Sequence, residues 1–342
     1  MQRILYVGMQ ADYGDVARGV SFEARNFHHT LRHFPGLIVE HFDFMAECRR
    51  VGQAAMSAAL LAKVAEFKPH LLFLVGFDDD HDPERETIRE ITETTETATL
   101  LWVCDDHWKF EGYSSRWAPV LDWIVTTDRD ALPKYAALGH GDNVILSQWA
   151  VNHRLYRPIY GLRDIAVSFV GQPHGDRAAI LEGLLRAGIG VNVFGYGWRQ
   201  GISRLPFHEM VRVFSRSRIN LNLSNSSTDA SKNPRGQQIK GRNFEVPGCH
   251  GFLLTQSVPY LEDYFEIGNE VVVFSDAADL LDKIRYYLAH EDERRRIATL
   301  GHARCLREHT WDHRLQAIFD HTGLSGGGGY AKQQGTAKGA LA

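Results

Sequence analysis

The stretch Leu71-Leu72-Phe73-Leu74-Val75-Gly76 decides the fold class. It is a short, unbroken apolar run between Pro69 and a glycine, so it predicts a strand that is buried on both faces. Similar runs recur through the first half of the chain, at residues 3–8, 37–42, 99–104, 123–127 and 143–147. Segments with helical spacing fall between several of them, at residues 21–34, 54–67 and 83–95. Such strands, separated by helices, predict a parallel sheet in an α/β domain.

The same pattern begins again after a linker at residues 152–163. Strands are predicted at residues 166–171, 190–195, 219–223, 251–255 and 270–274, and helices at residues 177–187, 207–215, 261–265 and 277–289. We therefore expect two Rossmann-like domains, residues 1–155 and 156–322, that face a central cleft. The glycine-rich tail, residues 323–342, is predicted to be disordered.

Composition supports an ordinary globular protein of about two domains. The chain has 342 residues, more than the roughly 250–300 that one hydrophobic core usually serves. Its apolar content is 44% and its formal net charge is −4, so no overall basic field favours nucleic acid or an anionic membrane. No apolar run approaches a membrane span, no signal-peptide pattern opens the chain, and the four cysteines are scattered. We expect a cytoplasmic protein with no bound metal, and the oligomeric state stays open.

The richest chemical signal is the segment QQIKGRNFEVPGCHGFLLT at residues 237–255. Lys240 and Arg242 stand beside a predicted helix start, which suits a diphosphate because backbone N–H groups and positive charge act together there. Glu245 could accept hydrogen bonds from ribose hydroxyls, as acidic residues do in dinucleotide-binding folds. A solvated helix face with an Arg–Glu pair explains the same spacing, so spacing alone leaves both interpretations open.

Other candidates in the second half lie where loops leave predicted strands. They are Gly171 and Arg177 for phosphate, Gly195 and Tyr196 for the face of a nucleobase, and Asn222 and Ser224 for its edge. Each has a plainer alternative as a helix-start, corner or turn residue.

In the first half, Arg18 and Gly19 belong to a glycine-bearing loop after the first strand, where a backbone can approach a ligand closely. Asp105, Asp106 and His107 directly follow a strand, and we expect them to orient an acceptor hydroxyl or to act as a base.

Three further patterns have structural explanations that we favour. The acidic run at residues 78–82 resembles a Mg²⁺ site, but it precedes Pro83 and a helix, so we expect it to cap that helix. His309 and His313 flank Trp311 without the glutamate of a zinc-protease helix. Arginines at residues 212, 216, 218 and 294–296 could suit an anionic acceptor, but such residues more often form solvated helix faces.

A family resemblance covers nearly the whole chain except its tail. Residues 240–314 resemble the glycosyl transferases group 1 domain of the CgeB-like proteins, through RNFEVPG at 242–248, GFLLT at 251–255, YYLAHEDER at 286–294 and EHTWDHR at 308–314. The stretches RGVSFE at 18–23, WVCDDHW at 102–108 and DWIVTTD at 122–128 are similar to that family's N-terminal domain.

The resemblance implies a GT-B glycosyltransferase. The C-terminal domain would hold a UDP-, GDP- or dTDP-sugar, and the N-terminal domain would hold the acceptor. In related retaining enzymes two glutamates separated by seven residues contact the donor; Glu245 matches the second, whereas Gln237 stands at the first position. The resemblance also implies retention of configuration without a metal. An inverting mechanism would need a base, for which Asp106 and His107 are the first candidates.

Several alternatives stay open. The glutamine at position 237 keeps open a GT-B-like protein that binds a nucleotide or sugar without turnover, and a sugar epimerase would use the same diphosphate site. An NAD-dependent oxidoreductase is disfavoured, because no GxGxxG follows the first strand. The acceptor is unidentified: a glycan, a lipid-linked molecule, a protein, a small molecule or a modified nucleic-acid base would each be compatible with the family.

Overall fold

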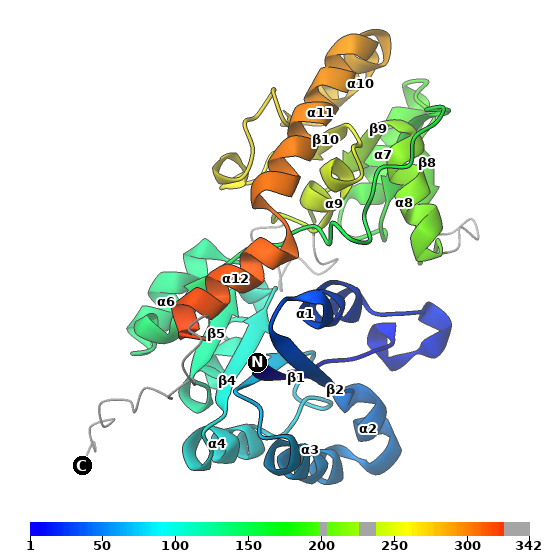
Figure 1. Ribbon diagram of the computed structural model, residues 1–342. Helices are drawn as coiled ribbons and strands as arrows, with labels where there is room; N and C mark the ends of the chain where they lie inside the picture. Colours follow the sequence, from blue (N-terminus) through cyan, green and yellow to red (C-terminus); the bar gives the residue numbers. More distant parts are fainter. Residues whose placement is uncertain (199–203, 226–236, 325–342) are drawn as a thin grey trace. The chain divides into compact units, whose positions relative to one another are not determined.

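The computed structural model describes residues 1–198, 204–225 and 237–324, and the chain divides into two compact units (Figure 1). Unit 1 is Met1–Gln148 together with the chain from Leu315 onward, and unit 2 is Trp149–Arg314. We predicted a boundary after residue 155 and a second domain that extends to residue 322. Helix α12 (Trp311–Thr322) instead crosses from unit 2 into unit 1. The predicted tail lies outside the described residues apart from Gly323 and Leu324.

Unit 1 contains a six-stranded parallel sheet of order β2-β1-β3-β4-β5-β6 among its described residues. The strands are β1 (Gln2–Val7), β2 (Leu37–Phe42), β3 (Leu71–Val75), β4 (Ala98–Val103), β5 (Trp123–Thr126) and β6 (Val144–Leu146). The helices are α1 (His29–His33), α2 (Phe44–Val51), α3 (Gln53–Phe67), α4 (Arg85–Thr94), α5 (Asp106–Lys109) and α6 (Leu132–Ala137). Each strand lies within one or two residues of its prediction. The central β3 is a continuous apolar run, whereas the edge strand β2 contains Glu40 and His41.

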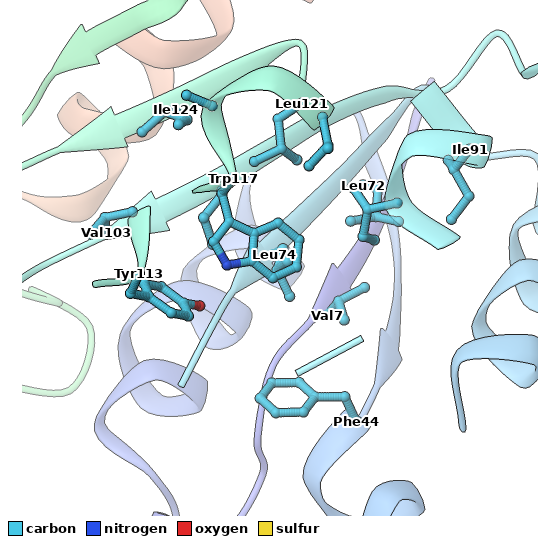
Figure 2. Close-up of a cluster of buried hydrophobic side chains, with 14 of the residues drawn as sticks. Val7, Phe44, Leu72, Leu74, Ile91, Val103, Tyr113, Trp117, Leu121 and Ile124 are labelled. Carbon is cyan, nitrogen blue, oxygen red and sulfur yellow. The ribbon is translucent and has the colours of Figure 1, made fainter. Parts of the chain in front are cut away.

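One face of this sheet packs against helices α2, α3 and α4. Figure 2 shows Val7, Leu72 and Leu74 of neighbouring strands around the Trp117 ring, with Phe44 of α2 beside them. These side chains are at most 1% exposed, so this face is a closed hydrophobic core.

The opposite face of the sheet is covered by a π-helical turn, Ala24–His28, that runs into α1. The ring centroid of Phe27 lies 5.6 Å from that of Phe73 and 4.9 Å from that of Trp102. The predicted helix at residues 21–34 is therefore present, but its first part is wound as a π turn. Because both faces are buried, the strands read as continuous apolar runs rather than alternating ones.

Unit 2 contains a second parallel sheet, of order β11-β10-β9-β7-β8 among the described residues. Its strands are β7 (Ile165–Val170), β8 (Asn192–Phe194), β9 (Ser217–Asn222), β10 (Leu253–Gln256) and β11 (Val272–Phe274). Its helices are α7 (Arg177–Arg186), α8 (Phe207–Arg216), α9 (Arg242–Gly248), α10 (Ala277–Ala289) and α11 (Glu291–Glu308), followed by α12. The predicted α/β class with two parallel sheets is confirmed. The segment expected to be a helix at residues 261–265 is a short 3-10 turn, Leu261–Asp263.

Candidate active site

In unit 2, two glycines bring the loops after β7 and β8 into contact. The Gly171 backbone N–H donates to the Phe194 carbonyl over 2.8 Å, and the Gly171 carbonyl accepts from the Trp198 indole N–H, also over 2.8 Å. A Cβ atom on Gly195 would lie only 2.1 Å from the Gly171 carbonyl oxygen, and the φ of Gly195 is 147°. Gly171 and Gly195, both predicted site residues, thus set the shape of this sheet edge.

We expect Gly195→Ala to destabilise unit 2 by about 2–4 kcal/mol, because the new methyl group would overlap the Gly171 backbone and strain its own. Gly190→Ala is a matched control, since nothing lies within 4 Å of its added methyl group. Urea unfolding followed by circular dichroism compares the two variants. Equal unfolding midpoints would contradict this packing.

Arg177 opens α7 and is 2% exposed. Its Nη1 donates to the Gln172 carbonyl over 2.9 Å, and its Nη2 donates to the carbonyls of Leu223, over 2.7 Å, and Asn225. We predicted that Arg177 contacts phosphate; the structure uses its terminal donors to hold the ends of the loops after β7 and β9 together. Burial, and secondarily the charge of Arg242, lowers the pKa of Arg177 to about 9.

Arg242, the first residue of α9, is the cation whose terminal nitrogens face this edge. Its Nε donates to the Asn222 Oδ1 over 3.0 Å, and its guanidinium lies 5.8 Å from the Phe169 ring centroid. Its Nη1 lies 3.3 Å from the place that a Cβ on Gly171 would occupy. Among the described residues, neither Nη group has a hydrogen-bond acceptor and no carboxylate forms an ion pair with it, although the charge of Glu245 acts on this guanidinium. Arg242 is therefore available to an anion beside Gly171.

Asn222 orients this arginine rather than facing a ligand. Its side chain is fully buried, and its Nδ2 donates to the Asn243 Oδ1 over 3.1 Å and to the Thr255 Oγ1 over 3.0 Å. These bonds aim its Oδ1 at the Nε of Arg242. We predicted that Asn222 and Ser224 contact the edge of a base. Ser224 is likewise fully buried, and its backbone N–H donates to the Gln256 side chain, so neither side chain is positioned for that contact.

His174 shows how much positive charge gathers on this edge. Burial, followed by the charges of Arg177, Lys240 and Arg242, lowers the pKa of this imidazole to about 4. Three cations thus act on a single neutral histidine in the loop after Gly171. Sequence reasoning missed His174, although its place between Gly171 and Arg177 was a usable signal.

The other predicted donor residues lie on the same unit. Glu245 is 4% exposed, and its Oε1 accepts from the Tyr156 hydroxyl over 2.6 Å. Tyr196 is 59% exposed, as a stacking surface requires. Gln237 forms a β-bridge with Asn225, whose carbonyl also accepts from Arg177. Gln237 and Glu245 therefore have defined places, but their contacts with a donor are still predictions.

In unit 1 the three residues after β4 have different environments. Asp106 is fully buried: its Oδ1 accepts from the Ser114 hydroxyl, and its Oδ2 accepts from the hydroxyls of Thr126, over 2.6 Å, and Tyr135, over 3.0 Å. Burial raises the pKa of this carboxyl group. The expectation that Asp106 meets the acceptor is corrected, because three internal hydroxyls occupy it. His107 is only 8% exposed, whereas Asp105 is partly exposed.

The loop after β1 folds tightly on itself and holds the predicted Arg18 and Gly19. The Arg18 Nε donates to the Asp12 Oδ2 over 2.9 Å, and its guanidinium lies 4.4 Å from the Tyr13 ring centroid. Gly19 has φ 79°, and its carbonyl accepts from the Asp12 backbone N–H over 2.9 Å. Arg18 thus braces Tyr13, a residue that sequence reasoning did not single out.

The acidic run after β3 does not cap α4 as we expected. Its Asp78 Oδ1 accepts from the backbone N–H groups of Asp80 and His81, and its Asp82 is 1% exposed. Asp82 accepts from the Tyr113 hydroxyl over 2.5 Å and from the Phe77 N–H over 2.7 Å. These acidic side chains therefore fold their own loop, and α4 begins without a side-chain cap.

Asp82 makes the stability of unit 1 depend on pH. Burial raises its pKa to about 7, well above that of an unfolded aspartate, so the folded state favours the protonated form. The stabilisation is complete below about pH 4 and is lost as the pH rises toward about 7, by roughly 2–3 kcal/mol between pH 5 and 8. Urea unfolding of the wild type and of Asp82→Asn at both pH values checks this. An equal pH dependence of both proteins would contradict it.

Two absences hold for residues 1–198, 204–225 and 237–324. No cluster of three or more His, Cys, Asp or Glu side chains there is arranged to hold a metal ion. No helix in that part of the chain is long and apolar enough to cross a membrane.

Comparisons with known proteins connect these residues to a family. Residues 177–320 match the family model described as "Glycosyl transferase-like". The spore protein CgeB of Bacillus subtilis (strain 168) is 22% identical, over 78% of this chain and 88% of CgeB.

Solved structures give the fold. Anabaena Alr3699/HepE, in complex with UDP and glucose, is similar with a TM-score of 0.62 at 10% identity, over 94% of this chain and 99% of that one. The sucrose-phosphate synthase of Thermosynechococcus elongatus has a TM-score of 0.61 at 11% identity, over 95% and 99% of the two chains. At these identities the likeness establishes the fold alone, which is GT-B. Residues 177–320 thus match a glycosyl transferase-like family model, the chain is similar to CgeB, and its fold is GT-B.

Proposed function

We propose that this protein is a glycosyltransferase that moves a sugar from a nucleotide sugar to an acceptor. The observation that carries the proposal is Arg242, whose Nη1 faces Gly171 and whose Nη groups have no hydrogen-bond acceptor among the described residues, while Arg177, Lys240 and Arg242 all act on His174 in the same loop cluster. A diphosphate fits this positive charge and the two Nη groups of Arg242. The structures of HepE with UDP and with UDP-glucose support UDP as the first nucleotide to test.

The arrangement suits cleavage of a sugar–phosphate bond. When that bond breaks, its electron pair goes to the leaving diphosphate oxygen, and the acceptor oxygen forms the new bond to the anomeric carbon. Cations already in place stabilise the charge that develops on the diphosphate, by a few kcal/mol for a good donor. We further propose that the configuration is retained and that the proton of the acceptor hydroxyl passes to the leaving phosphate, with no metal required.

The remaining predicted residues have roles within this proposal. Glu245, held by the Tyr156 hydroxyl, would accept from the ribose. The exposed ring of Tyr196 would stack on the base, and Gln237 would hydrogen-bond the donor sugar. In unit 1, Asp105 would contact the acceptor in preference to the buried Asp106.

A thermal-shift screen of UDP-, GDP-, ADP-, dTDP- and CMP-sugars, with and without EDTA, tests the donor site. Ligand binding to the native state must raise the melting temperature. We expect a shift with one nucleotide family that EDTA leaves unchanged. A shift that EDTA abolishes would contradict metal independence, and no shift with any nucleotide would contradict the donor site.

A further inference from the structure

We propose that Asn243 is a positioning residue that holds Lys240 and Arg242 together as one diphosphate-binding unit. This inference rests on the proposed function and deepens it, because it states how the two cations of the donor site are fixed relative to each other. Asn243 is the second residue of α9 and directly follows Arg242 in the chain. Its side chain is fully buried, so it acts on a ligand only through its neighbours.

The side chain of Asn243 turns back toward Lys240, two residues before α9 begins. Its Oδ1 accepts from the Lys240 backbone N–H over 2.8 Å, while the Asn243 backbone N–H donates to the Lys240 carbonyl over 2.9 Å. The N–H groups at the start of a helix have no partner within the helix, and a side chain that accepts from one of them fixes the entering chain. The backbone that carries the Lys240 ammonium group is therefore held against α9.

The same Oδ1 atom also determines the orientation of Arg242, through Asn222. It accepts from the Asn222 Nδ2 over 3.1 Å, and the Asn222 Oδ1 accepts from the Arg242 Nε over 3.0 Å. An amide group is planar, so a bond that holds its nitrogen also sets the direction of its oxygen. One oxygen atom of Asn243 thus connects the backbone of Lys240 with the guanidinium group of Arg242.

Thr255 completes this network from the neighbouring strand. Asn222 and Thr255 are partners in the register of β9 and β10, so their side chains lie on the same face of the sheet. The Thr255 Oγ1 accepts from the Asn222 Nδ2 over 3.0 Å and from the Asn243 Nδ2 over 3.1 Å. Asn222, Asn243 and Thr255 therefore form a closed triangle of hydrogen bonds, which we call the amide triad.

The polarity of the amide triad is not needed to fill the core. All three of its side chains are fully buried, whereas Leu253, two residues before Thr255 and on the same face of β10, is apolar and 1% exposed. Burying an amide costs free energy that its hydrogen bonds largely offset, so apolar side chains of similar shape would stabilise this position about as well. An apolar side chain, however, could not orient a guanidinium group. The triad is therefore best explained by the cations that it holds.

Because one network holds both cations, we expect their contributions to diphosphate binding to depend on each other. Side chains that are already ordered lose little freedom when a ligand binds, so each hydrogen bond to the diphosphate contributes more to the affinity. Without Asn243, the Asn222 amide loses one of the bonds that aim its oxygen at Arg242. The loss of Asn243 should therefore reduce the contribution that Arg242 itself makes.

A double-mutant cycle on the full chain, measured by calorimetric titration of UDP, tests this positioning role. We expect Asn243→Ala to weaken UDP binding about tenfold, because both cations lose their fixed positions. In that background, Arg242→Ala should weaken UDP binding by a factor about three times smaller than in the wild type. Uridine lacks the diphosphate, so its affinity, measured by saturation-transfer NMR, should be equal in the wild type and in Asn243→Ala.

Two further variants separate positioning from a folding defect. Asn220→Ala removes another buried amide of β9, whose Nδ2 donates to the carbonyls of Phe214, over 3.1 Å, and Phe252, over 3.3 Å. It should lower the midpoint of urea unfolding and leave the affinity for UDP unchanged. Thr255→Val keeps the shape of the side chain and removes its hydroxyl group, so it should fold and weaken UDP binding about threefold.

Several results would overturn the inference while leaving the proposed function intact. These are UDP binding by Asn243→Ala as tight as that by Asn220→Ala, an equal loss of affinity for uridine and UDP, or losses of Asn243→Ala and Arg242→Ala that multiply in the double variant. If Asn243→Ala does not fold, an unchanged UDP affinity of Thr255→Val overturns it instead. A wild type that binds no UDP contradicts the proposed function, and this inference then fails with it.

Discussion

Replacing Arg242 by alanine is expected to weaken UDP binding about 10- to 100-fold, the loss typical of charge-assisted hydrogen bonds. Its Nε is held by Asn222, so its terminal nitrogens reach the loop at Gly171 in a fixed orientation. Arg177 cannot replace it, because its terminal nitrogens already donate to backbone carbonyls. Calorimetric titration of UDP into the wild type and the variant measures the loss.

Two matched variants make this result specific. Arg242→Lys keeps the charge but lacks the planar fork, so we expect an intermediate affinity. Arg212→Ala removes an arginine of α8 whose side chain is 55% exposed, and it should bind UDP like the wild type. If Arg242→Ala binds UDP as tightly as Arg212→Ala, the assignment of the diphosphate site is wrong.

Replacing Asp106 by alanine is expected to destabilise unit 1 by about 3 kcal/mol, because buried hydroxyls would lose their shared acceptor. Those hydroxyls belong to Ser114, Thr126 and Tyr135. UDP binding should be retained, since the proposed diphosphate residues all lie in unit 2. Urea unfolding and calorimetric titration measure the two effects.

The neighbouring Asp105 provides the control for this substitution. It is partly exposed, so Asp105→Asn should change the stability by no more than about 0.5 kcal/mol while lowering transfer to the acceptor. The opposite pattern, a stable Asp106→Ala that binds UDP but transfers no sugar, would restore Asp106 to a direct catalytic role.

The strands were predictable because local sequence determines them. A continuous apolar run such as that of β3 is sufficient to indicate a strand buried on both faces. The π-helical turn was harder to predict from the sequence. Its one signal is that Phe22 and Phe27 are five residues apart, a wider spacing than the three or four of an α-helix. Helix α2 was missed, although Asp43 before it is an N-cap residue whose side chain accepts from the Ala46 N–H.

The roles of individual site residues depend on contacts that local sequence does not reveal. Asp105 and Asp106 are adjacent in the sequence, yet Asp106 is the buried one. It accepts hydrogen bonds from hydroxyls as far as 29 residues away in the chain, which the local sequence does not reveal. Arg177 had the pattern of a helix-start residue, yet carbonyls as distant as that of Asn225 enclose it. Arg242 was predicted as a phosphate contact, and the structure adds that Asn222, expected to contact the base, orients it.

The measurement that tests the central claim most directly is proton and phosphorus NMR of this protein with each nucleotide sugar that it binds. We predict that the anomeric signal of the donor decays while free nucleoside diphosphate accumulates, with a hydroxyl-rich acceptor or slowly with water. A donor that binds but keeps both its signals would contradict the claim and indicate a binding protein. A changed sugar on an intact diphosphate would also contradict it and indicate an epimerase.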